Sequence, residues 1–213
     1  MKEKIVLIGG GGHCRVIIDA IVNSGGYDVE GIVDPKLETD SKILGFPVLG
    51  DDDILLDLYK NGVRNAFVSV GSIGNCELRK ILYKEIKNIG FNMPVVVHPK
   101  AVVARDVKIG EGTFVAASAT VNPGTKIGKN VIINTSSSID HDCVIGDFVH
   151  IAPGAILSGG IRVGSQTHIG TGANVIQCIN IGKKCMIGAG LTLRDDLRDG
   201  QSYIKPGTEA NEN

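Results

Sequence analysis

The sequence of 213 residues contains no tryptophan, and aromatic residues make up only 4% of it. Neither charge is in excess, because 22 lysines and arginines stand against 23 aspartates and glutamates, for a net charge of −1. A chain without a basic run lacks the main attraction for nucleic acid, so we expect no nucleic-acid partner. No apolar stretch approaches the roughly 18 residues that cross a membrane, so no membrane segment is expected.

The cysteines exclude a further class of protein. There are five, they are scattered, and none forms a CxxC pair. This pattern is typical of reduced thiols and not of a disulfide or zinc framework.

The apolar run at residues 4–8 has no small-residue cleavage site and is typical of a first strand, not of a signal peptide. We therefore expect a cytoplasmic protein, with 43% hydrophobic residues for a globular core.

Glycine, in contrast, is abundant: 29 residues, or about 14% of the chain, which is roughly twice the usual share. From Val97 to Leu193 every sixth residue, 17 in all, is Ile, Val or Leu, and glycine often follows directly. A period of six is typical of a short strand plus a corner. Three such units make a triangular coil, and coils stacked about 4.8 Å apart form a parallel β-helix. Phe114 and Phe148 avoid every inward position of the repeat, as a narrow core requires.

Residues 1–96 have a different pattern, in which strands and helices alternate. We expect strands at 4–8, 29–33, 65–70 and 92–97, and helices at 14–22, 51–59 and 75–88. Such alternation predicts a small parallel sheet of Rossmann type. The chain thus divides into an α/β domain (1–96), a β-helix (97–195) and a polar C-terminal tail (196–213).

The glycine loop Gly9–Gly12, followed by His13, lies between the first strand and the first helix. Backbone N–H groups at such a helix start can bind a phosphate, and glycine lets the ligand approach the backbone. Cys14 stands where a dinucleotide fingerprint would need another glycine. Asp34, at the end of the second strand, is placed to bind a ribose or a base. A tight turn without a ligand is the alternative.

Histidines on the β-helix give candidates for catalysis. His141 lies at a corner, pointing outward, between Asp140 and Asp142. An imidazole beside a carboxylate is the minimal general base, because the carboxylate fixes the tautomer and raises the basicity. His150 and His168 are 18 residues apart and are therefore expected to stack on one face, one coil apart. A metal site would need three converging histidines, and no tight ligand spacing points to zinc.

Five features together resemble one family: IGGGGH (8–13), VD (33–34), VGSIGNCELR (70–79), NTSSSIDHDCVIGDFVHIAPGA (134–155) and the unbroken hexads. The family is that of the hexapeptide acyltransferases of the sialic acid O-acetyltransferase type. It includes the bacterial UDP-4-amino-sugar N-acetyltransferases of bacillosamine synthesis. The resemblance implies an α/β N-terminal Rossmann-like domain followed by a left-handed parallel β-helix. It also implies a homotrimer with active sites at the subunit interfaces.

The resemblance also implies roles for individual residues. His141 falls on the catalytic base and Asp142 on the acid that raises its basicity. The acetyl-CoA-binding positions fall on His150, Gly159, Gly170, Thr171 and Gly188. The nucleotide-sugar-binding positions fall on Gly11, Gly12, His13, Asp34, Gly71 and Asn75. The sequence departs from the family pattern at two places. Tyr203–Thr208 replaces the family's GxPA[KR] segment, which affects the expected CoA contacts of the tail. Pro35 replaces a second acid, which affects the expected uridine contacts.

We therefore predict an enzyme that transfers acetyl from acetyl-CoA, its co-substrate, to the amine of a UDP-4-amino-sugar, with no metal. The alternative within this chemistry is O-acetylation of a sugar such as sialic acid. More distant alternatives are a γ-class carbonic anhydrase, which would hold zinc, and a non-catalytic nucleotide-binding scaffold.

Overall fold

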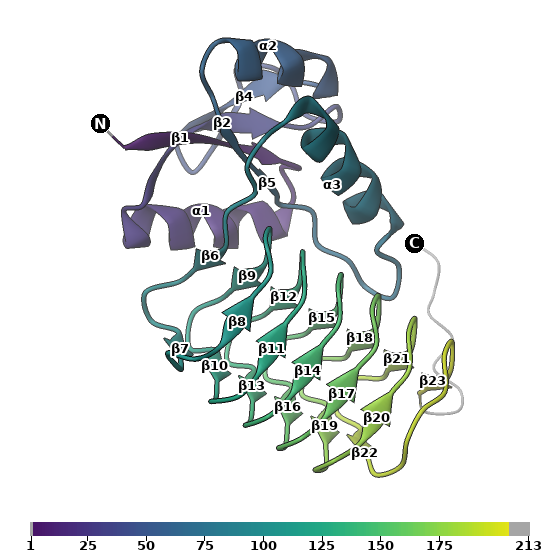
Figure 1. Cartoon of the computed structure of the whole chain (residues 1–213). Coiled ribbons are helices and arrows are strands. Elements are labelled where there is room, and N and C mark those ends of the chain that lie inside the picture. Colours follow the sequence, from purple (N-terminus) through teal and green to yellow (C-terminus); the bar gives the residue numbers. More distant parts are fainter. Residues whose placement is uncertain (1, 205–213) are drawn as a thin grey trace.

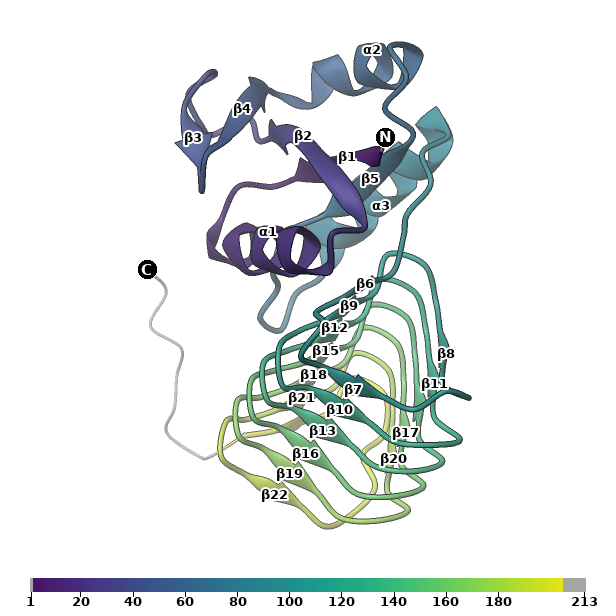
Figure 2. The same cartoon turned by 90° about the vertical axis from the view of Figure 1, so that its left-hand side faces the viewer.

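The computed structural model describes residues 2–204 and consists of an α/β domain placed above one end of a β-helix (Figures 1 and 2). The predicted order of an α/β domain followed by a parallel β-helix is confirmed. Among the described residues, no helix is long and apolar enough to span a bilayer.

The N-terminal sheet has five strands in the order β3-β4-β2-β1-β5. Its strands are β1 (Glu3–Ile8), β2 (Tyr27–Val33), β3 (Lys42–Ile43), β4 (Phe46–Gly50) and β5 (Asn65–Val68). The neighbours β1–β2, β1–β5 and β2–β4 are parallel, as expected for a Rossmann-like sheet. The antiparallel β3–β4 hairpin was not predicted. It turns at Leu44 and Gly45, which both have positive φ.

Helices cover both faces of this sheet. They are α1 (Gly12–Ser24), the short 3-10 helix η1 (Asp52–Ile54), α2 (Leu55–Lys60) and α3 (Glu77–Ile89). Helix α1 packs its apolar side against one face of the sheet and against the first coils of the β-helix, where Phe114 is buried. Helices α2 and α3 pack on the opposite face. Since α1 lies between the sheet and the coils, the glycine loop at its start faces the β-helix side of the domain (Figure 1).

The fourth strand expected at residues 92–97 is wrong. Asn92 forms only an isolated bridge with Asn65, and the strand that follows, Val96–Val97 (β6), pairs with the β-helix instead. Pro94 lies between them and has no N–H to donate to a sheet, so the strand of the N-terminal sheet cannot continue.

Three parallel sheets form the walls of the β-helix, and each strand has two residues. One wall contains β7 (Val102–Val103), β10 (Thr120–Val121), β13 (Ser138–Ile139), β16 (Ile156–Leu157), β19 (Asn174–Val175) and β22 (Thr192–Leu193). The second contains β8 (Lys108–Ile109), β11 (Lys126–Ile127), β14 (Val144–Ile145), β17 (Arg162–Val163) and β20 (Asn180–Ile181). The third contains β6, β9 (Phe114–Val115), β12 (Ile132–Ile133), β15 (His150–Ile151), β18 (His168–Ile169), β21 (Met186–Ile187) and β23 (Ser202–Tyr203).

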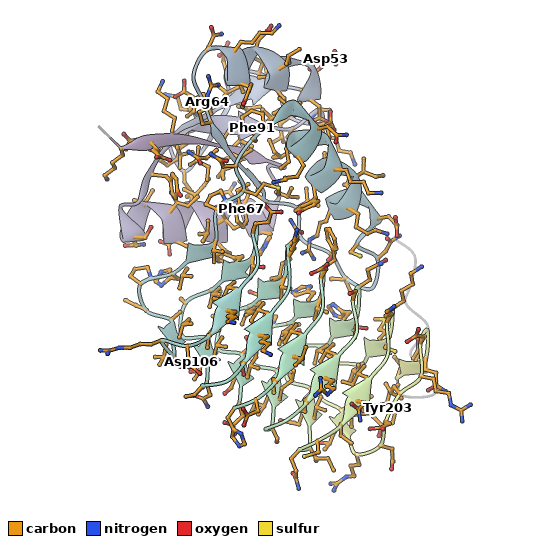
Figure 3. All side chains as sticks on the ribbon, in the orientation of Figure 1. Asp53, Arg64, Phe67, Phe91, Asp106 and Tyr203 are labelled. Atoms are coloured by element: carbon orange, nitrogen blue, oxygen red, sulfur yellow. The ribbon has the colours of Figure 1, made fainter. Side chains whose placement is uncertain are left out.

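The inward hexad positions form a single aliphatic core. Neither aromatic residue of the repeat enters it, which confirms the prediction. Phe114 packs under α1, and Phe148 packs edge-on against Tyr83, with ring centroids 5.3 Å apart. Figure 3 shows Phe67 and Phe91 in the N-terminal domain, above the coils. A core filled by aliphatic side chains and two cysteines, Cys143 and Cys185, explains why the sequence has so few aromatic residues.

One corner of the coils is lined by a column of glycines at 18-residue spacing, which includes Gly146, Gly164 and Gly182. A Cβ atom added at Gly164 would lie 2.5 Å from the carbonyl carbon of Gly182. The backbone of the next coil also lies within 2.6 Å of a Cβ position at Gly146 and at Gly182, beside the side chains of Ser165 and Asp199, so no side chain fits in this column.

The stack of strands continues past residue 195, where the sequence predicts the tail to begin. Strand β23 pairs with β21, and Leu197 forms a bridge with Ile181. Residues 205–213, the rest of the predicted polar tail, lie outside the described part of the chain.

Candidate active site

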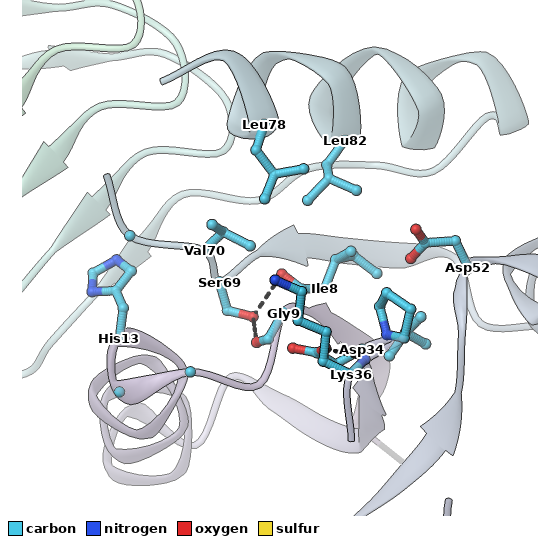
Figure 4. Close-up of a pocket in the computed structure, with 15 residues that line it drawn as sticks. Ile8, Gly9, His13, Asp34, Lys36, Asp52, Ser69, Val70, Leu78 and Leu82 are labelled. Atoms are coloured by element: carbon cyan, nitrogen blue, oxygen red, sulfur yellow. Dashed lines mark hydrogen bonds between the residues drawn. The ribbon is translucent and has the colours of Figure 1, made fainter. Parts of the chain in front are cut away.

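Three adjoining cavities run from the glycine loop to the third wall of the β-helix. The loop cavity, about 400 Å³, lies beside Gly9–Gly12 (Figure 4). The middle cavity, about 560 Å³, shares Gly12, His13 and Gly71 with it. The coil cavity, about 330 Å³, shares Ile73, Asn134 and His150 with the middle cavity. The three cavities therefore lie in a row, each next to the following one, from the N-terminal domain to the β-helix.

The loop cavity presents the start of helix α1 to a ligand. Gly11 is the N-cap, no side chain caps the helix, and its first turn contains no acidic residue. The free N–H groups and the positive end of the helix dipole are therefore available to an anion. Gly9 has a φ of +102°, which favours glycine at that turn. The predicted anion-binding loop thus has the geometry that its sequence requires.

Asp34 lines the loop cavity as predicted, but its carboxylate already has partners. Oδ2 accepts a hydrogen bond from the N–H of Gly10 (2.7 Å), and Oδ1 accepts one from the N–H of Lys36 (2.9 Å). Asp34 therefore holds the glycine loop in place. Any contact of this carboxylate with a ligand must use its remaining lone pairs.

The structure places five of the six predicted nucleotide-sugar residues on the loop cavity, namely Gly11, Gly12, His13, Asp34 and Gly71. Asn75 does not line it. Its Oδ1 accepts a hydrogen bond from the N–H of Glu77 and closes a turn just before α3, which begins two residues later than predicted. Ser69, Lys36 and Asp52 also line the cavity and were not identified from the sequence. Ser69 and Lys36 come just after strands β5 and β2, and that position is the signal that could have found them.

His13 lies between the loop and middle cavities and is half-buried against Phe114, with ring centroids 5.4 Å apart. Burial lowers its pKa to about 4, and the charge of Arg79 acts in the same direction. The imidazole is therefore neutral near pH 7. It can form hydrogen bonds with a ligand but adds no charge to the anion site.

Arg79 on α3 joins the two halves of the chain from a fully buried position. Its guanidinium donates to the backbone carbonyl and Oδ1 of Asn130 on the β-helix, and to Oγ of Ser72 (3.0 Å). Among the described residues no carboxylate pairs with it. The loop that contains Ser72 is thereby fixed over the third wall of the β-helix.

The coil cavity brings together four of the predicted acetyl-CoA residues, namely His150, Gly170, Thr171 and Gly188. His150 is buried and uses both ring nitrogens. Nδ1–H donates to the Ser72 carbonyl (2.5 Å), which leaves Nε2 to accept from the Asn134 amide (3.3 Å). Burial lowers the pKa of His150 to about 3, and the neighbouring His168 acts in the same direction. His150 is thus a neutral, fully engaged side chain and not an available base.

His141 is the opposite case. Its side chain is 62% exposed, and its Nδ1 lies 2.9 Å from Oδ2 of Asp142. The hydrogen bond to Asp142, followed by the charge of Asp140, raises the pKa of His141. When Nδ1–H is donated to the carboxylate, Nε2 keeps its lone pair and can accept a proton. The predicted carboxylate–imidazole pair is therefore formed.

Gly159 belongs to the His141 corner and not to the coil cavity. His141 lies between β13 and β14, and Gly159 lies one coil further on, between β16 and β17. The coil cavity extends over the third wall and the corner that follows it, which contains Ala152 and Pro153. A single chain therefore places His141 and the coil cavity at different corners of the prism. Within residues 2–204, no three His, Cys, Asp or Glu side chains are grouped as metal ligands would be.

Two family models match the chain: the PglD N-terminal domain over residues 4–86 and the bacterial transferase hexapeptide (six repeats) over residues 124–159. Nothing matches among the curated proteins.

Solved structures are similar over almost the whole chain. An H-to-N variant of perosamine N-acetyltransferase from Caulobacter crescentus, in complex with CoA and GDP-perosamine, has 36% identity and a TM-score of 0.88 over 99% of this chain and 97% of its own. PerB from the same organism, also with CoA and GDP-perosamine, has 37% identity and a TM-score of 0.87 over 97% and 96%.

A third solved structure is the acetyltransferase domain of PglB from Neisseria gonorrhoeae FA1090, in complex with acetyl coenzyme A. It has 35% identity and a TM-score of 0.88 over 96% of this chain and 97% of its own. Identity of this order over the full length of both chains, together with the two family models, shows a common family. The chain belongs to the hexapeptide-repeat acetyltransferases that have a PglD-type N-terminal domain.

Proposed function

We propose that this protein transfers the acetyl group of acetyl-CoA to the amine of a nucleotide-linked amino sugar. The continuous row of three cavities is the observation that carries this proposal. The diphosphate binds at Gly11 and Gly12, the sugar extends into the middle cavity, and acetyl-CoA occupies the coil cavity. The Caulobacter relative, whose complexes hold CoA and GDP-perosamine, supports this assignment.

In the proposed reaction the sugar amine attacks the thioester carbon directly. As the new C–N bond forms, Nε2 of His141 takes a proton from the amine, and Asp142 keeps the ring in the required tautomer. The C–S bond then breaks, and the proton passes from His141 to the departing thiolate to give CoA. No covalent acyl-enzyme is needed. The exposure of His141 and its raised pKa support this role, whereas His150 has no free nitrogen.

The separation of His141 from the coil cavity within one chain supports a homotrimer. His141 and the coil cavity lie at different corners of one prism, so a complete site requires a second copy to bring its His141 to this coil cavity. Three copies arranged around an axis parallel to the long axis of the β-helix give each coil cavity one His141 from a neighbouring copy. Equilibrium sedimentation tests this assembly, and an active monomer would refute it. A cytoplasmic location remains a prediction from the cysteine pattern.

For the nucleotide we propose uridine, with guanosine as the second candidate. The UDP assignment comes from the resemblance to the UDP-4-amino-sugar enzymes, and the GDP-perosamine held by the Caulobacter relative favours the second. The far end of the loop cavity contains Lys36 and Asp52. A lysine and a carboxylate can pair with the carbonyl oxygen and the N–H of either base.

The test uses the purified full-length chain with acetyl-CoA and, in separate reactions, a UDP-4-amino-sugar, GDP-perosamine and sialic acid. Release of the CoA thiol and the mass of the acetylated sugar are measured. We expect turnover with an amino sugar, fastest with the UDP-linked one. Turnover with sialic acid alone would support O-acetylation instead. Absence of acetyl-CoA binding by calorimetry would support a non-catalytic scaffold.

A further inference from the structure

His168 is a buried histidine for which the reaction above has no use. It lies one coil beyond His150 on the third wall, with the two rings edge to face and their centroids 4.8 Å apart. Its side chain is only 7% exposed, and its Nδ1 is buried without a hydrogen-bond partner. Within residues 2–204, no protein group bonds to the other ring nitrogen either. An imidazole in this state is costly to the folded protein.

The surroundings of the ring fix its protonation. Burial lowers the pKa of His168, so the ring is neutral and has one N–H. A buried N–H without an acceptor is rarer and more costly than a buried lone pair without a donor. The proton therefore resides on Nε2, and the lone pair on the buried Nδ1. His168 then presents one N–H donor that the protein itself does not use.

His168 helps to line the coil cavity, so a ligand in that cavity can reach this donor. The other imidazole of this cavity, His150, uses both of its nitrogens, and the Asn134 amide is bonded to His150. The lining around Met186 and Ile187 is apolar. A ligand that enters this cavity with a carbonyl oxygen therefore meets a free N–H in an apolar environment, where a hydrogen bond is strengthened.

We propose that His168 binds the acyl donor, by donating its Nε2–H to a carbonyl oxygen of acetyl-CoA in the coil cavity. This inference rests on the proposed function, which places acetyl-CoA there. Acetyl-CoA has two kinds of carbonyl that fit: the thioester and the amides of the pantetheine arm. A bond to the thioester oxygen strengthens as negative charge develops in the transition state, whereas a bond to an amide contributes equally to substrate and transition state.

The test compares His168→Phe with His168→Gln. Phenylalanine fills the same space and keeps the contact with His150 but has no donor, whereas the glutamine amide can place an N–H near the position of Nε2. We expect His168→Phe to weaken acetyl-CoA binding or turnover about tenfold, the effect of one lost hydrogen bond. His168→Gln should recover most of it. Unfolding in urea should show His168→Phe to be at least as stable as the wild type, because an unpaired buried nitrogen is removed.

Calorimetry with acetyl-CoA and with CoA separates the two carbonyls. Weaker binding of acetyl-CoA alone, with a lower kcat, assigns the bond to the thioester. Equal weakening of both ligands, with a higher KM, assigns it to a pantetheine amide. A folded His168→Phe that binds and turns over acetyl-CoA like the wild type would overturn the inference and leave the proposed function standing. Failure of the wild type to bind acetyl-CoA would instead refute the proposed function.

Discussion

Gly159 lies one coil beyond His141, and a Cβ atom at Gly159 would lie 2.5 Å from Nε2 of His141. The ring therefore occupies space that only a glycine leaves open. The nitrogen affected is the one that we assign as the base, so the absence of a side chain at residue 159 determines where the base can point.

Gly159→Ala should therefore reduce turnover by displacing His141. Gly159 does not have a positive φ, so alanine causes no backbone strain and the fold should remain. A displacement of about 1 Å at the reacting group lowers kcat by about 10²-fold. Gly26→Ala is the matched control, because its Cβ would meet nothing closer than Oγ of Ser24 at 3.9 Å. Wild-type kcat in Gly159→Ala would contradict this position for the base.

Replacement of His141 itself tests the chemistry. His141→Ala should lower kcat by about 10²–10⁴-fold, the usual contribution of a general base. Because the side chain is exposed and its ring contacts only Asp142 by hydrogen bond, the urea midpoint should stay close to that of the wild type. Near-normal turnover of this variant in the thiol-release assay would refute the assignment.

Asp142→Asn should shift the pH dependence of kcat. A general base works only when neutral, so activity is lost as the pH falls through the pKa of His141. The hydrogen bond to Asp142 raises that pKa. Loss of this bond should move the acidic limb of the kcat profile to lower pH and should lower the maximal kcat. Asparagine tolerates the positive φ of 59° at this residue. An acidic limb that does not move would show that the profile reports another group.

Arg79→Met should destabilise the junction of the two halves. The substitution leaves the buried acceptors of Asn130 without their partner, at a cost of about 3 kcal/mol in the free energy of unfolding. Arg64→Met is the control, since Arg64 is exposed and has only local contacts, stacking on the Tyr59 ring 4.4 Å from its centroid and donating to the Tyr59 carbonyl. Urea denaturation of the two variants measures the difference, and equal midpoints would contradict the role given to Arg79.

Stability should fall as the pH is lowered from 6.5 to 5. The pKa values of His13 and His150 are depressed to about 4 and about 3 in the folded protein. The unfolded chain therefore takes up protons in this range while the folded chain does not. The slope is at most about 1.4 kcal/mol per pH unit for each histidine. His141, whose pKa is raised, opposes this trend.

The variants His13→Phe and His150→Phe provide the check on this assignment. Each should flatten the dependence of the free energy of unfolding on pH between 5 and 6.5, measured by urea titration at several pH values. A slope that both variants leave unchanged would mean that other groups take up the protons.

The structural features that could be predicted from the sequence were those set by adjacent residues or by a repeat. The inward aliphatic positions recur every six residues, so the coil and the stacking of His150 on His168 were predictable. The His141–Asp142 pair was predictable because the two residues are adjacent. The burial of His150 was not, because an outward residue on a β-helix is usually solvated, and the Ser72 carbonyl that covers it comes from 78 residues earlier.

The same reason explains what the sequence did not reveal in the N-terminal half. Asn75 stands in a motif that matches the family, but its side chain accepts from the N–H of Glu77 in a turn before α3, a contact that only the local backbone reveals. The last strand was expected to extend the sheet because Val96 and Val97 are apolar, and their pairing with Phe114 and Val115 is a contact between the two halves. Patterns within one element do not report which neighbour it will meet.

The column of backbone contacts at Gly146, Gly164 and Gly182 limits how the length of this chain can change during evolution. An insertion or deletion within the coils that is not a multiple of 18 residues shifts the hexads out of register with that column and is expected to be lost. A whole coil added after Ala189, the last residue that lines the coil cavity, only lengthens the prism. The same coil added before His150 would move the acyl site about 4.8 Å away from the glycine loop and beyond the reach of Ser72. The number of coils before His150 therefore sets the length of the substrate that can join the two halves.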